Sequence, residues 1–331
     1  MKLYDDKLLV ITGGAGFIGS GVLRCLSDKG MKKNLVVVDE LGRSEKWKNL
    51  VAKDFGEFLS KEELFPWLEG RESEIAAFIH LGACSDTTER DADYLLQNNY
   101  RFSVNLAEYA LKHGHRFIYA SSAATYGNGS EGFSDDHDKL DVLRPMNMYG
   151  FSKHMFDMWA KHQGVLNSVV GLKYFNVFGP NENHKGHMAS AITRMLPDLK
   201  EKGFINLFKS SDPANYADGE QCRDFIYVKD AVRMTCAFLE SEVCGVFNIG
   251  TGNPSTWNQL AQSTIKAFGK EEAFIRYVDM PEKLLGKYQN YTCADMGKFR
   301  EKMGDAAAKT MTIENSVIEY VREYLMKGIK W

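Results

Sequence analysis

The sequence predicts an α/β fold in which a doubly wound parallel sheet carries a smaller α/β domain. Three observations predict this fold: continuous apolar runs recur along the first half of the chain, helical patterns separate them, and the alternation becomes irregular after Asn176. Continuous apolar runs are typical of parallel strands that are buried on both faces. Regular alternation of such strands with helices indicates a doubly wound sheet.

Five apolar runs before Asn176 are expected to form strands of this sheet. They are residues 7–12 (KLLVIT), 34–39 (NLVVVD), 76–81 (AAFIHL), 116–120 (RFIYA) and 168–174 (SVVGLKY). Helices are expected between them at about residues 17–29, 91–112 and 148–161, and the one at 91–112 is long and amphipathic.

The second half of the chain has a weaker pattern, which indicates a smaller, interrupted domain over the carboxyl edge of the sheet. Loops are expected at 179–186 and 210–221, strands at 224–228 and 246–249, and helices near 188–202, 229–240 and 256–268. The predicted division assigns residues 1–175 plus about 224–254 to the sheet domain, and about 176–223 plus 255–331 to the smaller domain.

The composition is that of an ordinary water-soluble protein. Apolar residues make up 44% and charged residues 26% of the chain, and the formal net charge is −3. That charge gives no basic field for nucleic acid or an anionic membrane, and no apolar run reaches the roughly 18 residues of a membrane span. The N-terminus lacks a secretory pattern, and the six cysteines form no C-x-x-C pair. We therefore expect a cytoplasmic protein with reduced thiols and no metal site.

Residues 12–19 (TGGAGFIG) form a glycine-rich turn with the spacing G-x-x-G-x-x-G. Gly13 permits the tight turn, Gly16 lets the backbone approach a diphosphate, and Gly19 lets the helix pack closely against the strand. The free N–H groups at the start of the helix favour an anion there. Because this turn follows an apolar strand and opens a helix, it predicts a Rossmann-type dinucleotide-binding domain.

The end of the second strand bears on the choice of dinucleotide. Asp39 lies about 20 residues after the last glycine, where a carboxylate bonds the ribose hydroxyls of NAD. Arg43, Lys46 and Lys61 are nearby in the sequence, and a basic side chain here suits the 2′-phosphate of NADP. The residues alone leave NAD and NADP open.

Tyr149 and Lys153 form a Tyr-x-x-x-Lys pair on the helix expected at 148–161. Positions i and i+4 share a helix face, so the lysine ammonium is expected to lower the pKa of the tyrosine, which then accepts the proton of an alcohol. Ser122 lies just past the strand at 116–120, and ligands of such sheets bind at the carboxyl ends of the strands. The three residues predict a site that oxidises and reduces an alcohol carbon.

At these motifs the chain resembles the extended short-chain dehydrogenase/reductase family, which acts on nucleotide-activated sugars. Further segments that carry this resemblance are YFNVFGP (174–180), RDFIYV (223–228) and FNIGTG (247–252). More distinctive segments resemble the branch of that family that epimerises ADP-heptose at carbon 6. They are GACSDTTE (82–89), YASSAATYG (119–127), HKGHMAS (184–190) and KLLGKYQNY (283–291).

The resemblance implies an isomerase that inverts carbon 6 of ADP-D-glycero-β-D-manno-heptose for the inner core of lipopolysaccharide. It implies NADP as the preferred cofactor, with NAD as the alternative, and a homo-oligomer, often a pentamer. The alcohol at carbon 6 gives hydride to the nicotinamide, and the resulting 6-ketone is reduced on its other face. Because the substrate reacts in two orientations, two acid/base groups are expected.

The resemblance also implies roles for individual residues. Tyr149 is the expected base, Lys153 its electrostatic partner, Ser122 the hydroxyl partner, and Lys185 a second acid/base. Cofactor contacts are expected for Gly13, Gly16, Phe17, Ile18, Gly19, Asp39, Glu40, Lys46, Lys61, Leu81, Gly82, Ala83, Cys84, Ser85, Asn98, Lys153, Val177 and Lys185. Substrate contacts are expected for Asn176, His187, Arg194, Phe208, Lys209, Ser210, Ser211, Arg223 and Tyr288.

Two departures from the family and three rival functions stay open at this stage. His187 stands where the family pattern has a serine, and the loop at 210–221 is longer than that pattern. A UDP-sugar 4-epimerase shares the serine–tyrosine–lysine set but has no need of Lys185. A dehydratase needs an acidic pair after the strand-end serine, where Ala123 and Ala124 stand. A non-catalytic NAD(P)-sensing module commonly lacks the tyrosine or the lysine.

Overall fold

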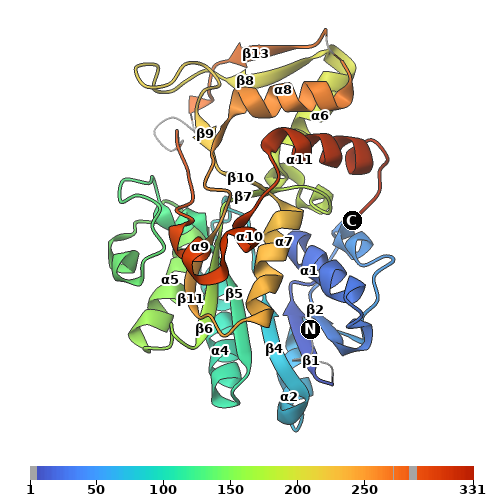
Figure 1. The fold of residues 1–331 in the computed structure, drawn as a ribbon, viewed down its shortest axis with the longest axis vertical. Coiled ribbons are helices and arrows are strands. Elements are labelled where there is room, and N and C mark those ends of the chain that lie inside the picture. The colour runs from blue at the N-terminus through green and yellow to red at the C-terminus, as the bar shows by residue number, and fades with distance from the viewer. Residues whose placement is uncertain (1–5, 271, 283–288) are drawn as a thin grey trace.

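A parallel sheet forms the centre of the molecule (Figure 1). The computed structural model describes residues 6–270, 272–282 and 289–331, and within these ranges the sheet has seven strands in the order β11-β6-β5-β4-β1-β2-β3. The strands are β1 (Leu8–Thr12), β2 (Leu35–Val38), β3 (Glu57–Leu59), β4 (Ile75–His80), β5 (Arg116–Ser122), β6 (Val169–Tyr174) and β11 (Gly245–Ile249). The order reverses at β1, so the predicted Rossmann-type, doubly wound fold is confirmed.

Helices cover the sheet in two groups. In one group α1 packs against α7, and in the other α4 packs against α5. The bounds are α1 (Phe17–Asp28), α2 (Lys61–Leu68), α3 (Ala92–Leu95), α4 (Phe102–Lys112), α5 (Met148–His162) and α7 (Val228–Ala237). A π-helical segment, Leu96–Arg101, joins α3 to α4, so the long helix expected at 91–112 is present with a local widening.

The register of the strands aligns their carboxyl ends at one edge of the sheet. Thr12 at the end of β1 pairs with His80 at the end of β4, and His80 pairs with Tyr119 on β5. The centres of these strands are fully buried, as the continuous apolar runs require. The glycine turn after β1, the loop after β4 and Ser122 at the end of β5 therefore lie along the same edge.

A smaller α/β region lies above this edge in the view of Figure 1. Strands β8 and β13 pair in parallel, α6 and α8 pack against β8, and α11 packs against α8. Two further strand pairs, β7 with β10 and β9 with β12, are short. The bounds are β7 (Asn176–Phe178), α6 (Ala191–Lys202), β8 (Phe204–Phe208), β9 (Cys222–Arg223), β10 (Phe225–Tyr227), β12 (Ser255–Thr256), α8 (Trp257–Phe268), β13 (Phe274–Val278) and α11 (Ile313–Glu319).

Two short C-terminal helices lie beside the sheet rather than in the smaller region. They are α9 (Gly297–Met303), which packs against β11, and α10 (Asp305–Ala308), which packs against α7. The domain boundaries given above stay a prediction. The packing of α9 and α10 concerns the segment 255–331, which that prediction assigns to the smaller domain. In the described ranges no helix is both long and apolar enough to span a bilayer.

The structure differs from the sequence prediction in the segment before α6 and in the segment after β2. The helix expected from residue 188 begins at Ala191, because residues 183–188 form a tight turn (η8, Asn183–Met188) in which Gly186 has φ 54°. Helix α2 and strand β3 were not predicted. The start of α2 is fixed by a capping box between Ser60 and Glu63.

Candidate active site

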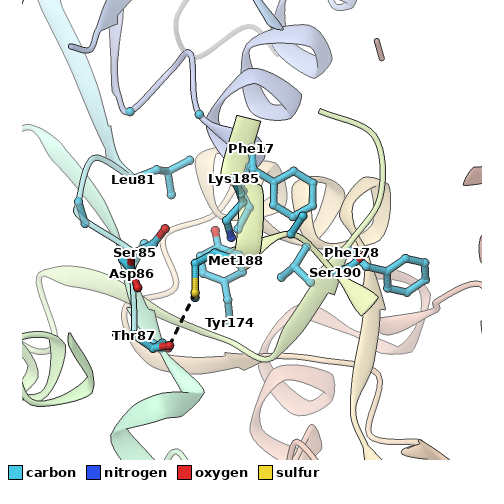
Figure 2. Close-up of a pocket in the computed structure, with 18 of the residues that line it drawn as sticks. Phe17, Leu81, Ser85, Asp86, Thr87, Tyr174, Phe178, Lys185, Met188 and Ser190 are labelled. Carbon is cyan, nitrogen blue, oxygen red and sulfur yellow. Dashed lines mark hydrogen bonds between the residues drawn. The ribbon is translucent and has the colours of Figure 1, made fainter. Parts of the chain in front are cut away.

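A cleft of about 660 Å³ lies at the carboxyl edge of the sheet, below the smaller region. Its walls come from the glycine turn after β1, the loop after β4, the end of β5, the start of α5 and residues 174–194 (Figure 2). All the residues predicted to be catalytic line it, namely Ser122, Tyr149, Lys153 and Lys185.

Most of the residues predicted to contact a dinucleotide also line this cleft. They are Gly13, Gly16, Phe17, Ile18, Gly19, Asp39, Lys46, Leu81, Gly82, Ala83, Cys84, Ser85, Lys153, Val177 and Lys185. The other three form a cluster beside it, in which Lys61 donates to Asn98 Oδ1 at 3.1 Å and lies 3.5 Å from Glu40 Oε1.

The glycine turn leaves room that side chains would fill. Gly13 has φ 70°, and a Cβ there would lie 2.7 Å from the backbone nitrogen of Gly82. A Cβ on Gly19 would lie 2.1 Å from the carbonyl oxygen of Gly13. In the described part of the chain no side chain caps the N-terminus of α1 at Gly16. The turn and the uncapped N–H groups fit the diphosphate of a nicotinamide dinucleotide.

Asp39, just after β2, is held by protein donors. Its Oδ2 accepts a hydrogen bond from Ala15 N at 2.8 Å, within the glycine turn. Its Oδ1 accepts from Glu40 N and from Lys46 Nζ, both at 2.7 Å. The cleft therefore presents, just past the end of β2, a carboxylate that already carries a lysine partner.

Tyr149 and Ser122 meet because α5 approaches the segment after β5 very closely. Asn147 caps α5 by accepting a hydrogen bond from Gly150 N at 2.8 Å. A Cβ on Gly150 would lie 2.8 Å from the carbonyl oxygen of Ala124, so a larger residue would separate the two segments. At this contact the Ser122 side chain lies close enough to Tyr149 to influence the pKa of that phenol.

Burial dominates the electrostatics of the Tyr-x-x-x-Lys pair. Desolvation raises the pKa of Tyr149, and the Ser122 side chain acts in the opposite direction. Desolvation also lowers the pKa of Lys153 to about 8, against the attraction of Asp157. The net shift of Tyr149 is thus opposite to the lowering expected from sequence, because loss of hydration outweighs its neighbours.

A fully buried ion pair lies one helical turn beyond Lys153. Asp157 contacts Lys173 Nζ at 2.6 Å, and neither side chain is exposed to solvent. Asp157 also accepts hydrogen bonds from Tyr119 (2.9 Å) and Ser121 (2.8 Å) on β5. This network joins α5 to the strand that carries Ser122. The sequence analysis did not identify it, because its partners come from three separate segments.

Lys185 reaches the cleft from η8. Figure 2 shows its side chain directed into the cleft beside Phe17, with Nζ 5.5 Å from the centre of that ring. Burial lowers the pKa of Lys185, and the nearby carboxylate of Glu182 opposes that shift. A lysine with a lowered pKa is suited to give and take protons near neutral pH.

The same turn contacts the loop after β4 across the mouth of the cleft. Thr87 donates to Met188 Sδ at 3.8 Å, the dashed contact in Figure 2. His187 Nε2 lies 3.4 Å from Asp86 Oδ2, and the His187 side chain is 66% exposed. Sequence reasoning missed Asp86, Thr87 and Met188 as lining residues, although they belong to the distinctive segments 82–89 and 184–190.

The residues predicted to bind substrate are only partly brought together. Asn176, His187 and Arg194 line the cleft. Arg223 is buried behind it, with its guanidinium 5.9 Å from the centre of Trp257, a lining residue that was not predicted. The remaining described ones do not line the cleft: Phe208 ends β8, and Lys209, Ser210 and Ser211 follow it. Tyr288 lies outside the described residues.

Comparison with known proteins gives one family. Residues 9–250 match the model of the NAD dependent epimerase/dehydratase family. The chain is 47% identical over 327 residues to the ADP-L-glycero-D-manno-heptose-6-epimerase of Nitratidesulfovibrio vulgaris Hildenborough, covering 96% of this chain and 98% of that one. It is 40% identical to the enzyme of the same name from Fusobacterium nucleatum, covering 97% and 98%.

Solved structures agree with the family assignment. The ADP-L-glycero-D-manno-heptose-6-epimerase of Helicobacter pylori superposes with a TM-score of 0.79 at 25% identity, covering 97% of this chain and 96% of the other. The UDP-glucose 4-epimerase of Thermotoga maritima gives 0.76 at 26% identity, covering 97% and 99%. Both similarities extend over the sheet and the smaller region together.

Proposed function

Because the chain belongs to the NAD-dependent epimerase/dehydratase family, we propose that it interconverts ADP-D-glycero-β-D-manno-heptose and ADP-L-glycero-β-D-manno-heptose, in the supply of heptose for lipopolysaccharide. The observation that carries this proposal is that one cleft holds Ser122, Tyr149, Lys153 and, from a different element, Lys185. The relatives of nearly equal length that share 40–47% of the sequence support the choice of substrate.

The chemistry is assigned to side chains as follows. A nicotinamide bound in the cleft supplies reversible hydride transfer at carbon 6 of the heptose. Tyr149 takes the proton of the carbon-6 hydroxyl, and Ser122 holds that oxygen within hydrogen-bonding distance. The ammonium of Lys153 stabilises the negative charge on Tyr149 in the state in which the phenol has lost its proton.

Inversion requires the 6-ketone to present its other face, and its oxygen then points away from Tyr149. Lys185, on η8 rather than α5, is the group we assign to proton transfer in that second orientation. A 4-epimerase or a dehydratase has no step that calls for a separate lysine at this place. The two-group arrangement therefore favours epimerisation at carbon 6.

We assign NADP as the preferred cofactor on the geometry of Asp39. Both of its carboxylate oxygens are already occupied by protein donors, and Lys46 lies with it at the cleft wall. The lysine is thus placed to attract a 2′-phosphate, while the carboxylate is less free to bond ribose hydroxyls than it is in NAD-specific sites.

The test is to incubate the purified protein with ADP-D-glycero-β-D-manno-heptose and to follow the configuration at carbon 6 by NMR. Appearance of the L-glycero epimer supports the proposal, and an unchanged spectrum with cofactor bound contradicts it. Sedimentation velocity of the same sample tests the proposed homo-oligomer, a pentamer by resemblance. Fractionation of the source cells tests the proposed cytoplasmic location.

A further inference from the structure

Lys185 lies on a loop, residues 182–190, whose two ends are joined by a single buried carboxylate. Glu182, at the start of this loop, is 1% exposed. Its Oε2 accepts a hydrogen bond from Ser190 N at 2.8 Å, and its Oε1 accepts from Ser190 Oγ at 2.5 Å. One side chain thus spans the loop from its first residue to its last.

The same carboxylate fixes the loop to two helices. Glu182 Oε1 accepts hydrogen bonds from Thr193 Oγ1 on α6 at 3.1 Å and from Tyr320 OH, just after α11, at 2.8 Å. All these partners donate, which suits an ionised carboxylate because that group only accepts. Hydrogen bonds to an ionised acceptor are about twice as strong as neutral ones.

Between these anchors, side chains beside Lys185 have partners of their own. Asn183 Oδ1 accepts a hydrogen bond from Lys330 Nζ at 2.9 Å, and His184 Nδ1 lies 3.3 Å from Asn49 Nδ2.

The tip of the loop turns at Gly186, where φ is 54°, and meets the loop after β4 through His187 and Met188. Lys185 N donates to the carbonyl of Glu182 at 2.9 Å. Glu182 therefore constrains the place of the Lys185 ammonium in two ways. Its backbone carbonyl accepts from Lys185 N, and its side chain accepts the hydrogen bonds that hold the ends of the loop.

We propose that Glu182 is a positioning residue that holds Lys185 in its reactive place through the four hydrogen bonds it accepts from Ser190, Thr193 and Tyr320. This inference rests on the proposed function insofar as it concerns the rate of epimerisation. The negative charge of Glu182 supports it independently, because that charge opposes the loss of the proton that burial promotes on Lys185. Glu182 itself does not line the cleft in the described structure, so it acts through Lys185.

A double-mutant cycle tests the proposal. Glu182→Gln keeps the shape but replaces one acceptor oxygen by an NH2 donor and makes the remaining hydrogen bonds neutral, so kcat is expected to fall by about 10- to 100-fold with little change in KM, as for other small misplacements of a reacting group. In the Lys185→Met background the same change should have almost no further effect on kcat, because the group that Glu182 positions is already gone. An equal fold-loss in both backgrounds would mean a general structural role and would overturn the proposal.

A second measurement does not depend on activity. Trypsin cuts after Lys185 when the loop opens, so Glu182→Gln should shorten the lifetime of that peptide bond under native conditions. Thr193→Val removes one donor and should act in the same direction more weakly, which keeps the test usable if Glu182→Gln does not fold. Unchanged cutting at Lys185 in every folded variant overturns the inference. Failure of the proposed function is separate, because it would appear as a wild-type protein that leaves carbon 6 unchanged.

Discussion

Replacement of Lys185 by methionine separates proton transfer from binding at this site. Methionine is unbranched like lysine, one atom shorter and uncharged, so it keeps apolar contact with Phe17, whose ring centre lies 5.5 Å from the ammonium. The cation–π contact that is lost is worth about 0.5–2 kcal/mol. Removal of a charge that burial disfavours offsets part of that loss. We therefore expect the melting temperature to change little.

The effect on catalysis should be much larger. A positioned acid or base contributes about 10²–10⁴-fold to the rate, so kcat of Lys185→Met should fall at least about 10²-fold, equivalent to about 2.7 kcal/mol of activation free energy. The assay is initial-rate epimerisation of ADP-heptose at saturating substrate. Lys202→Met is a matched control, because Lys202 is 52% exposed and pairs with Asp198 on the surface of α6. A Lys185→Met enzyme with normal kcat and a raised KM would refute the two-group mechanism.

Three further outcomes are expected. Tyr149→Phe should retain the fold and the cofactor but lose about 10²–10⁴-fold in kcat, and a near-normal rate would remove Tyr149 from the mechanism. Lys46→Ala should weaken NADP more than NAD in fluorescence titrations, because only NADP carries the 2′-phosphate; equal weakening would mean that Lys46 serves the fold alone. Burial lowers the pKa of His80 to about 3, so the folded state binds fewer protons than the unfolded one between about pH 3 and pH 6.5. The free energy of unfolding should therefore decrease by up to about 1.4 kcal/mol per pH unit as the pH falls through that range, and denaturant titrations of His80→Gln should lack this contribution.

Most of the central sheet could be predicted because its strands, apart from β3, lie in mainly apolar runs. The run at 34–39 contains β2, all of whose residues are buried. The pair β8 and β13 has no such run, since both strands alternate or expose their side chains. Helix α2 was missed because Pro66 interrupts the helical pattern, although the spacing of Ser60 and Glu63 was a usable signal for its start.

The candidate site was predictable where chemistry depends on local spacing. Tyr149 and Lys153 are four residues apart on one helix, and the glycines of the first turn are three apart. The hydrogen bonds that the Glu182 side chain accepts could not be predicted, because their donors come from positions 190, 193 and 320, which only tertiary packing brings together. The direction of the pKa shift at Tyr149 was missed for the same reason, since burial is not visible in a four-residue motif.

The Asp39 carboxylate accepts three hydrogen bonds from the protein, and this limits how the cofactor preference of this enzyme can be redesigned. The carboxylate to which we assign a part in cofactor choice also binds the glycine turn through Ala15 N. A substitution of Asp39 would therefore change two properties at once, the choice between NAD and NADP and the overall affinity for dinucleotide. A screen for altered cofactor choice would then select against tight binding. In the described part of the chain, Lys46 contacts that carboxylate and makes no hydrogen bond to the glycine turn itself, so it is the better position at which to vary the two properties separately.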